Sequence, residues 1–154
     1  MMINRNYAYS HSSALKVSSV KPVLQLICHG AIEIANTRKM YCPDFGISYG
    51  YRTAEEQFEL FKKGRKIIND VWVIHIWSDV VTYCDGYNTI SIHQTRLAID
   101  FFALDDQGRV DYSPQSMALV ATCFFESASN EQVDIDWGGS FKSISDSGHI
   151  EVVT

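Results

Sequence analysis

The most informative run of this sequence is SIHQTRLAIDFFAL, residues 91–104. From Leu97 to Leu104 every residue except Asp100 is apolar, which predicts a strand at the centre of a sheet. A carboxylate inside such a strand is costly unless something neutralises it. His93 stands seven residues before Asp100, so a loop must turn its imidazole back over the strand. A metal ion shared by the two side chains would justify that geometry.

The run DSGHIEVV, residues 146–153, offers the remaining groups of a catalytic metal site. His149 would be the third ligand, and three protein ligands leave a fourth position open for water. Asp146 lies three residues earlier in a glycine-containing turn, where it could act as a general base. Glu151 could orient a ligand. Arg52, just before a helix start, could stabilise charge on a carbonyl oxygen.

Each of these residues also has an ordinary structural explanation. A histidine and an aspartate at this spacing occur together by chance in many chains, so the spacing of His93 and Asp100 does not establish a metal site. Asp146 could bond to its own backbone in a turn. Trp137, taken alone, fits a core residue beside the strand break at Gly138-Gly139. The residues by themselves therefore leave the site open.

The composition indicates one globular domain. The chain has 154 residues, of which 46% are hydrophobic and 12% aromatic, enough for a core that needs no disulfides. We expect a flexible N-terminal arm at residues 1–13 and a single domain at residues 14–154. The net charge is -5, without the basic face that phosphates require, so we expect no nucleic-acid partner. No C-x-x-C pair is present, and we expect reduced, mostly packed cysteines at Cys28, Cys42, Cys84 and Cys123.

No segment predicts a signal peptide or a membrane span. Residues 1–13 lack the apolar stretch of a signal peptide, and the most apolar later run, residues 71–76, is too short to cross a bilayer. We therefore expect synthesis in a cytoplasm and no membrane partner.

Periodicity and capping residues predict the other elements. Apolar spacing predicts helices from Pro22 to Asn36, from the Thr53 cap to Gly64, and from Ser113 to about residue 130. Alternating apolar residues predict strands within residues 41–50, 133–137 and 149–153. Residues 65–90 are harder to assign, and we interpret them as a strand followed by a turn at Asp85-Gly86.

Further motifs point to a known family. The sequence contains PDFGI at residues 43–47, GYRTAEEQ at 50–57, CDGY at 84–87 and WGGSF at 137–141. Together with Ser91-x-His93, Ala98-x-Asp100 and Asp146-x-x-His149-x-Glu151, in this order, they resemble the zinc-dependent D-alanyl-D-alanine carboxypeptidase and L-alanyl-D-glutamate endopeptidase family. The chain looks most like the small phage endolysins of that family, from about Leu15 onwards.

The resemblance implies a fold and a site. The fold would be α+β, of the hedgehog and DD-peptidase type, with a small antiparallel sheet that bears the zinc site and helices packed against it. By resemblance, His93, Asp100 and His149 would bind one Zn²⁺, Asp146 would be the general base, and Arg52 would hold the substrate or transition state. The matching motifs also suggest residues for substrate binding or ligand support, namely Gln57, Ser91, Trp137 and Glu151.

The resemblance also implies an activity. We expect a zinc metallopeptidase that hydrolyses an amide bond in peptidoglycan stem peptides, and first of all a monomeric L-alanyl-D-glutamate endopeptidase. As a phage endolysin it would be made in the host cytoplasm and act on the cell envelope. One alternative is a D-alanyl-D-alanine carboxypeptidase or a wall-peptide recycling enzyme. Another is a non-catalytic, zinc-stabilised wall-binding module, although Asp146 argues against it because a structural zinc site needs no base.

One position departs from the family pattern. The family commonly has glycine three residues after the first histidine, where this chain has Arg96. Glycine readily adopts a positive φ, so the sequence leaves the backbone of this loop undetermined. Residues 66–83 also match the family poorly, which leaves the loop contacts with a substrate open.

Overall fold

A five-stranded antiparallel sheet forms the centre of the molecule. The structure is a computed structural model and describes residues 5–141 and 146–154. The strand order is β1-β4-β7-β6, and β5 pairs with the C-terminal end of β4. The strands are β1 (Asp44–Tyr49), β4 (Ala98–Leu104), β5 (Val110–Asp111), β6 (Ile135–Trp137) and β7 (His149–Val152). Because β4 lies between β1 and β7, the prediction of a central strand is confirmed.

The two faces of β4 have different surroundings. Ile99, Phe101 and Ala103 are fully buried and belong to the hydrophobic core. Asp100 points to the opposite face, because successive side chains of a strand alternate. The register places Asp100 directly opposite His149 of β7. Directly opposed residues share a face of the sheet, so strand pairing alone brings these two side chains together.

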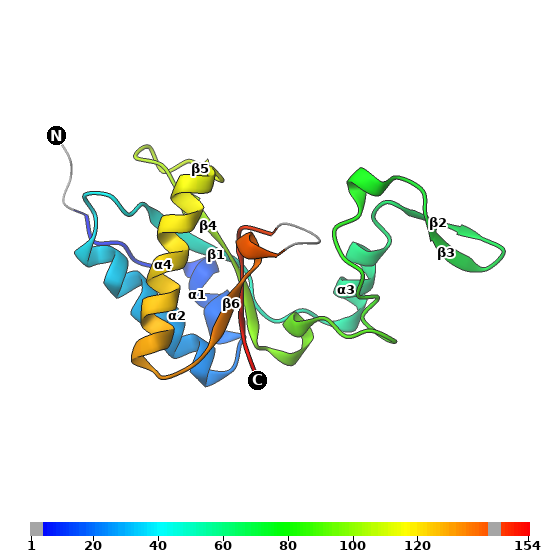
Figure 1. Cartoon of the computed structure of the whole chain (residues 1–154), viewed down its shortest axis with the longest axis horizontal. Helices are drawn as coiled ribbons and strands as arrows, with labels where there is room; N and C mark the ends of the chain where they lie inside the picture. Colours follow the sequence, from blue (N-terminus) through cyan, green and yellow to red (C-terminus); the bar gives the residue numbers. More distant parts are fainter. Residues whose placement is uncertain (1–4, 142–145) are drawn as a thin grey trace.

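Three helices pack on the core side of the sheet (Figure 1). They are α1 (His11–Ser18), α2 (Pro22–Thr37) and α4 (Pro114–Asn130), and the last two confirm the predicted helices. Helices α2 and α4 approach closely at Gly30, where any side chain would collide with Ser127. Cys28, Cys42 and Cys123 are buried in this core. No helix in the part of the chain that the structure describes is long and apolar enough to span a membrane. The expected α+β fold is confirmed.

The N-terminal segment differs from the expectation for residues 1–13. Helix α1 begins at His11, inside the expected flexible arm. Before it, Tyr9 packs against the core, and its hydroxyl donates a hydrogen bond to the carbonyl of Cys28 at 2.6 Å. The segment is mostly polar and too short to show a helical period, so its contacts could not be read from the sequence. Residues 1–4 lie outside the described residues.

Residues 54–90 form an arm that projects from the body of sheet and helices (Figure 1). It contains α3 (Ala54–Phe61), a hairpin of β2 (Arg65–Ile68) and β3 (Val71–Ile74), and the short 3₁₀ helix η1 (Trp77–Asp79). The predicted capping box of Thr53 and Glu56 is present at the start of α3.

The assignment of one strand to this region is wrong, because the chain forms two. Their connection is the turn Asn69-Asp70, in which both residues have positive φ, 50° and 60°, as in tight two-residue hairpins. Residues 80–83, which preceded the expected turn at Asp85-Gly86, contain no strand.

Candidate metal centre

Three side chains converge on the face of the sheet opposite the helices. His93 comes from the 3₁₀ helix η2 (Ile92–Thr95), Asp100 from β4 and His149 from β7. One ligand atom from each of these residues lies within 4.8 Å of the other two. Both histidines are buried, and Asp100 is half-buried. The structure thus brings together the three residues that the sequence singled out as ligands.

In each imidazole, the ring nitrogen that does not face Asp100 lies close to a protein oxygen, which orients the ring. Nδ1 of His93 lies 2.8 Å from the carbonyl oxygen of Gly50, so this nitrogen donates and Nε2 faces Asp100 at 3.3 Å. Nε2 of His149 lies 2.6 Å from the Glu151 carboxylate, and Nδ1 faces Asp100 at 3.2 Å. Histidine ligands of metals are held in this way. Two nitrogens and one carboxylate oxygen fit a zinc ion with one open position.

The electrostatics of the cluster favour a positive charge. Burial by itself would raise the pKa of Asp100, but hydrogen bonds from His149 and His93 outweigh it and hold the pKa well below the usual range. Burial lowers the pKa of His149, yet hydrogen bonds to Asp100 and Glu151 outweigh this effect and raise the pKa above its ordinary value. A cation placed between these groups is therefore stabilised.

Ser91 supports His93 rather than facing the cluster. Its hydroxyl accepts a hydrogen bond from the backbone N–H of His93 at 3.4 Å, and the side chain of Gln94 accepts one from the backbone N–H of Ser91 at 2.9 Å. These two bonds form a capping box at the start of η2. The hydroxyl is thus engaged in presenting the histidine.

Arg96 ends the same helix in the left-handed conformation, with φ of 64°. Its guanidinium lies 4.2 Å from the centroid of the Tyr51 ring and donates a hydrogen bond to the carbonyl of Ser19 at 3.3 Å. The arginine therefore adopts a backbone conformation that glycine takes without strain. Its side chain points to the surface beside Tyr51 and fixes the loop there.

A buried glutamine orients the Arg52 side chain toward the cluster. Its Nη2 lies 3.5 Å from Oδ2 of Asp100, and Nη1 donates to Oε1 of Gln57 at 2.9 Å. Gln57 is fully buried, and its amide nitrogen donates to the carbonyl of Cys84 at 2.9 Å and to the hydroxyl of Thr82 at 3.2 Å. Because the polar atoms of Gln57 are engaged within the protein, Gln57 positions Arg52 and does not face a ligand.

Asp146 lies at the solvent-exposed side of the cluster. Partial burial and the nearby negative charge of Asp100 raise the pKa of its carboxyl. The turn that carries it is held by Trp137, whose indole N–H donates to the carbonyl of Ser147 at 2.8 Å. Trp137 also packs against the core, so the structural explanation and a supporting role both apply to it.

Two groups that orient side chains of the site were not predicted from the sequence. The carbonyl of Gly50 orients His93, and a backbone group cannot be recognised from residue type. Position 50 requires glycine, because a side chain there would collide with Ser19 and the backbone of Lys16. This requirement becomes visible only in the structure. The Tyr49 ring lies 5.3 Å from the Arg52 guanidinium and confines it.

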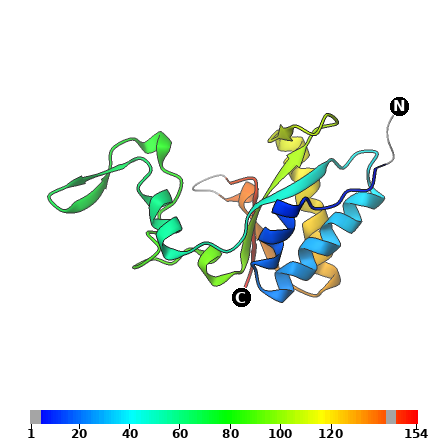
Figure 2. The same cartoon turned by 180° about the vertical axis from the view of Figure 1, so that it is seen from behind.

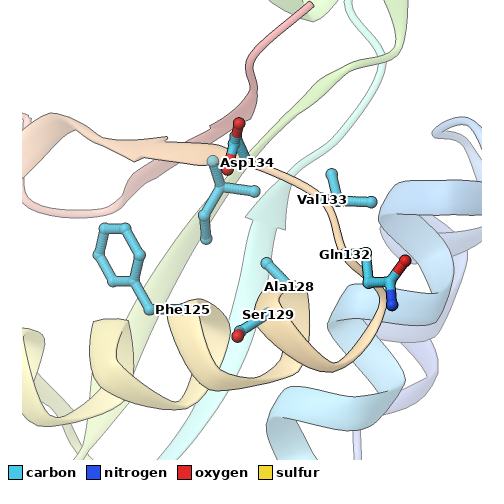
Figure 3. A pocket seen from close by; sticks show the side chains of 7 residues that line it. Phe125, Ala128, Ser129, Gln132, Val133 and Asp134 are labelled. Atoms are coloured by element: carbon cyan, nitrogen blue, oxygen red, sulfur yellow. The ribbon is translucent and has the colours of Figure 1, made fainter.

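A surface hollow elsewhere does not contribute to this site. It lies between the end of α4 and β6 (Figure 3). Its lining residues are Phe125, Ala128, Ser129, Gln132, Val133, Asp134 and Ile135. Asp134 is the one ionisable side chain among them, so the hollow lacks the several ligands that a metal ion requires.

Two comparisons with known proteins find similarities. Residues 85–152 match a family model described as D-alanyl-D-alanine carboxypeptidase, and this segment contains His93, Asp100 and His149. The fold is similar to the crystal structure of Serratia marcescens L-Ala D-Glu endopeptidase ChiX, with a TM-score of 0.70 and 19% sequence identity, covering 95% of this chain and 90% of that chain. A comparison with curated sequences finds no match.

Proposed function

We propose that this chain, whose residues 85–152 match a family model described as D-alanyl-D-alanine carboxypeptidase, is a zinc-dependent peptidase of bacterial peptidoglycan. Its first candidate reaction is hydrolysis of the bond between L-alanine and D-glutamate in the stem peptide. The observation that carries the proposal is the convergence of His93, Asp100 and His149, with the second nitrogen of each imidazole held by a protein oxygen.

The residues of the cluster have separate roles in this reaction. His93 through Nε2, Asp100 through its carboxylate and His149 through Nδ1 would hold the ion. Zinc supplies Lewis acidity, which makes a water molecule more acidic and polarises the scissile carbonyl. Asp146 accepts the proton of the attacking water and returns it to the leaving amine. Arg52, fixed by Gln57, donates to the carbonyl oxygen as negative charge develops there.

Two observations favour different members of the family. The fold similarity to an L-Ala D-Glu endopeptidase covers 95% of this chain and supports an endopeptidase. The matched family model is described as a carboxypeptidase, which keeps terminal D-alanine release, or recycling of wall peptides, as the second candidate. A non-catalytic wall-binding module has less support, because Asp146 and Arg52 both lie at the cluster and a structural site uses neither.

The proposed biological setting is lysis of a bacterial host by a phage. It rests on the resemblance of the motifs from PDFGI to HIEV to those of small phage endolysins. In this setting a monomer made in the host cytoplasm reaches the wall and cuts it. Addition of the purified protein to cells with a permeabilised outer membrane is then expected to lower the turbidity of the suspension.

The decisive experiment uses defined muropeptides and mass spectrometry. Zinc-loaded protein is expected to release products cut between L-alanine and D-glutamate, and a chelator is expected to abolish the cleavage. Asp146→Asn is expected to lower kcat by at least about 100-fold, since a general base contributes that much, while the bound zinc measured by elemental analysis is unchanged. Asp134→Asn, far from the cluster, is the control and keeps full activity.

Three outcomes would count against parts of this assignment. Loss of zinc in Asp146→Asn would make Asp146 a ligand rather than the base. Release of terminal D-alanine alone would favour the carboxypeptidase. Failure of the zinc-loaded protein to cut any muropeptide would exclude the proposed reaction.

A further inference from the structure

The arm, residues 54–90, has no hydrophobic core of its own. Among the described residues, no buried hydrophobic residue lies between Ile47 and Ala98. The hairpin of β2 and β3 is a separate two-stranded sheet, and such a hairpin is marginally stable in water alone. The arm is held instead by aromatic contacts, because the Phe58 ring packs edge-on against Trp72 at 5.8 Å and Tyr87 at 5.9 Å.

The arm presents large apolar and aromatic side chains to solvent. Trp77 is 69% exposed, Tyr83 54% and Tyr87 58%. Isolated exposed apolar residues are common on protein surfaces, but their concentration on one projecting unit indicates an interaction surface. Tyrosine and tryptophan suit a partner that is itself partly polar.

The arm also carries the densest group of positive charges in an acidic chain. Residues 62–66 read KKGRK and include four of the 13 basic residues, whereas the whole chain has a net charge of -5. Lys62 is paired with Glu59 at 2.5 Å, but Lys63 and Lys66 are exposed. The arm as a whole also carries six acidic residues, Glu55, Glu56, Glu59, Asp70, Asp79 and Asp85. An anionic group of the partner is therefore favoured at the KKGRK segment and not along the whole arm.

We propose that the arm binds the glycopeptide polymer of the wall, with sugar rings stacked on the exposed aromatic rings and peptide carboxylates beside Lys63 and Lys66. This inference rests on the proposed function. The arm lies in the sequence between Arg52 and His93, two residues of the candidate site, and both of its ends lead back to the body (Figure 2). A polymer whose stem peptide occupies the cluster passes beside the arm.

Two other occupants fit the arm less well. The tip of the hairpin is Asn69-Asp70, both exposed, and insertion of an aspartate into a bilayer is costly, which argues against a lipid surface. In a symmetric contact of two arms through this segment, a second copy of the chain would place its KKGRK segment opposite the first, and like charges repel. The anionic, sugar-rich polymer meets neither objection.

The test compares one enzyme on two substrates. Intact peptidoglycan sacculi engage the arm, whereas a short stem peptide without sugars reaches the cluster alone. Trp77→Ala and Lys66→Glu are each expected to lower the rate of sacculus digestion about tenfold, the usual effect of removing one central contact. Their kcat/KM on the short peptide is expected to equal that of the wild type. The matched controls, Tyr112→Ala and Lys39→Glu on the body, are expected to alter neither rate.

A binding measurement separates this proposal from the proposed function. Co-sedimentation of the chelated protein with sacculi requires no cleavage, and the two arm variants are expected to lose it while the controls keep it. If the wild type cuts no peptide but binds sacculi through the arm, the proposed reaction fails and the arm proposal stands. Equal binding by wild type and arm variants would overturn the arm proposal. So would arm-dependent binding to phosphatidylglycerol vesicles, or an arm-dependent dimer in sedimentation velocity, in place of sacculus binding.

Discussion

Arg96 illustrates how a single side chain can offset an unfavourable backbone. A non-glycine residue in the left-handed region costs about 1 kcal/mol or more. The guanidinium recovers part of this through its contact with the Tyr51 ring at 4.2 Å, since an exposed cation–π contact is worth about 0.5–1 kcal/mol. The two contributions are of similar size, so the loop tolerates an arginine where the related motifs have glycine.

Substitution of Arg96 tests this balance. Arg96→Gly is expected to change the free energy of unfolding by less than about 1 kcal/mol, because relief of backbone strain compensates for the lost contact. Arg96→Val is expected to destabilise the protein by about 1–2 kcal/mol, because a β-branched residue resists positive φ. Urea unfolding of the metal-free protein measures both values. A loss above about 2 kcal/mol in Arg96→Gly would show that the side-chain contacts dominate.

At the residue scale, the sequence predicted side chains and missed backbone groups. His93, Asp100, His149, Asp146 and Arg52 were selected because their types and spacing match a motif, and the structure brings the first three together. The Gly50 carbonyl was not selected, because its role depends on where the chain passes and not on residue chemistry. The supporting function of Gln57 likewise depends on burial, which its place in the GYRTAEEQ motif does not reveal.

At the scale of elements, caps and periodicity predicted the helices well. The Thr53 capping box and the Ser113-Pro114 start act locally, so the sequence contains the whole signal. The β2–β3 hairpin was missed for a physical reason. Its turn is Asn-Asp rather than the usual Asn-Gly or Asp-Gly, and its strands, RKII and VWVI, do not alternate polar and apolar residues, so neither the turn nor the alternation marks the hairpin.

The contact of α2 with α4 gives a prediction at this scale. Gly30→Ala is expected to destabilise the protein by about 1–3 kcal/mol, because the new methyl group collides with the Ser127 hydroxyl in a closely packed interface. Combination with Ser127→Ala is expected to recover part of this loss, because removal of the hydroxyl makes room. Thermal unfolding of the single and double variants measures the coupling. Strictly additive effects would mean that the two residues do not limit the approach of the helices.

At the scale of the whole molecule, metal binding links the site to stability. In the metal-free protein, His149 has a raised pKa, so its contribution to stability is present below about pH 6.5, the ordinary histidine value, and is lost as pH rises through the raised value. Binding of the proposed zinc ion would reverse this trend, because a metal ion binds the deprotonated imidazole and competes with the proton.

Thermal melting in chelator and in zinc, each at about pH 6 and about pH 8, measures this linkage. We expect the increase in Tm that zinc produces to be larger at the higher pH. His149→Ala is expected to abolish both the increase and its pH dependence. An increase that shrinks as pH rises would contradict the assignment of His149 as a ligand.

The pairing of β7 with β4 has a consequence for the newly made chain. His93 and Asp100 are close in the sequence and reach one another through a short local turn. His149 joins them only when the last strand has been synthesised and has paired with β4. A ribosome-bound chain that has been translated only as far as α4 holds two of the three ligands and lacks Asp146. The proposed amide-bond hydrolysis therefore requires β7 to have been synthesised and to have paired with β4.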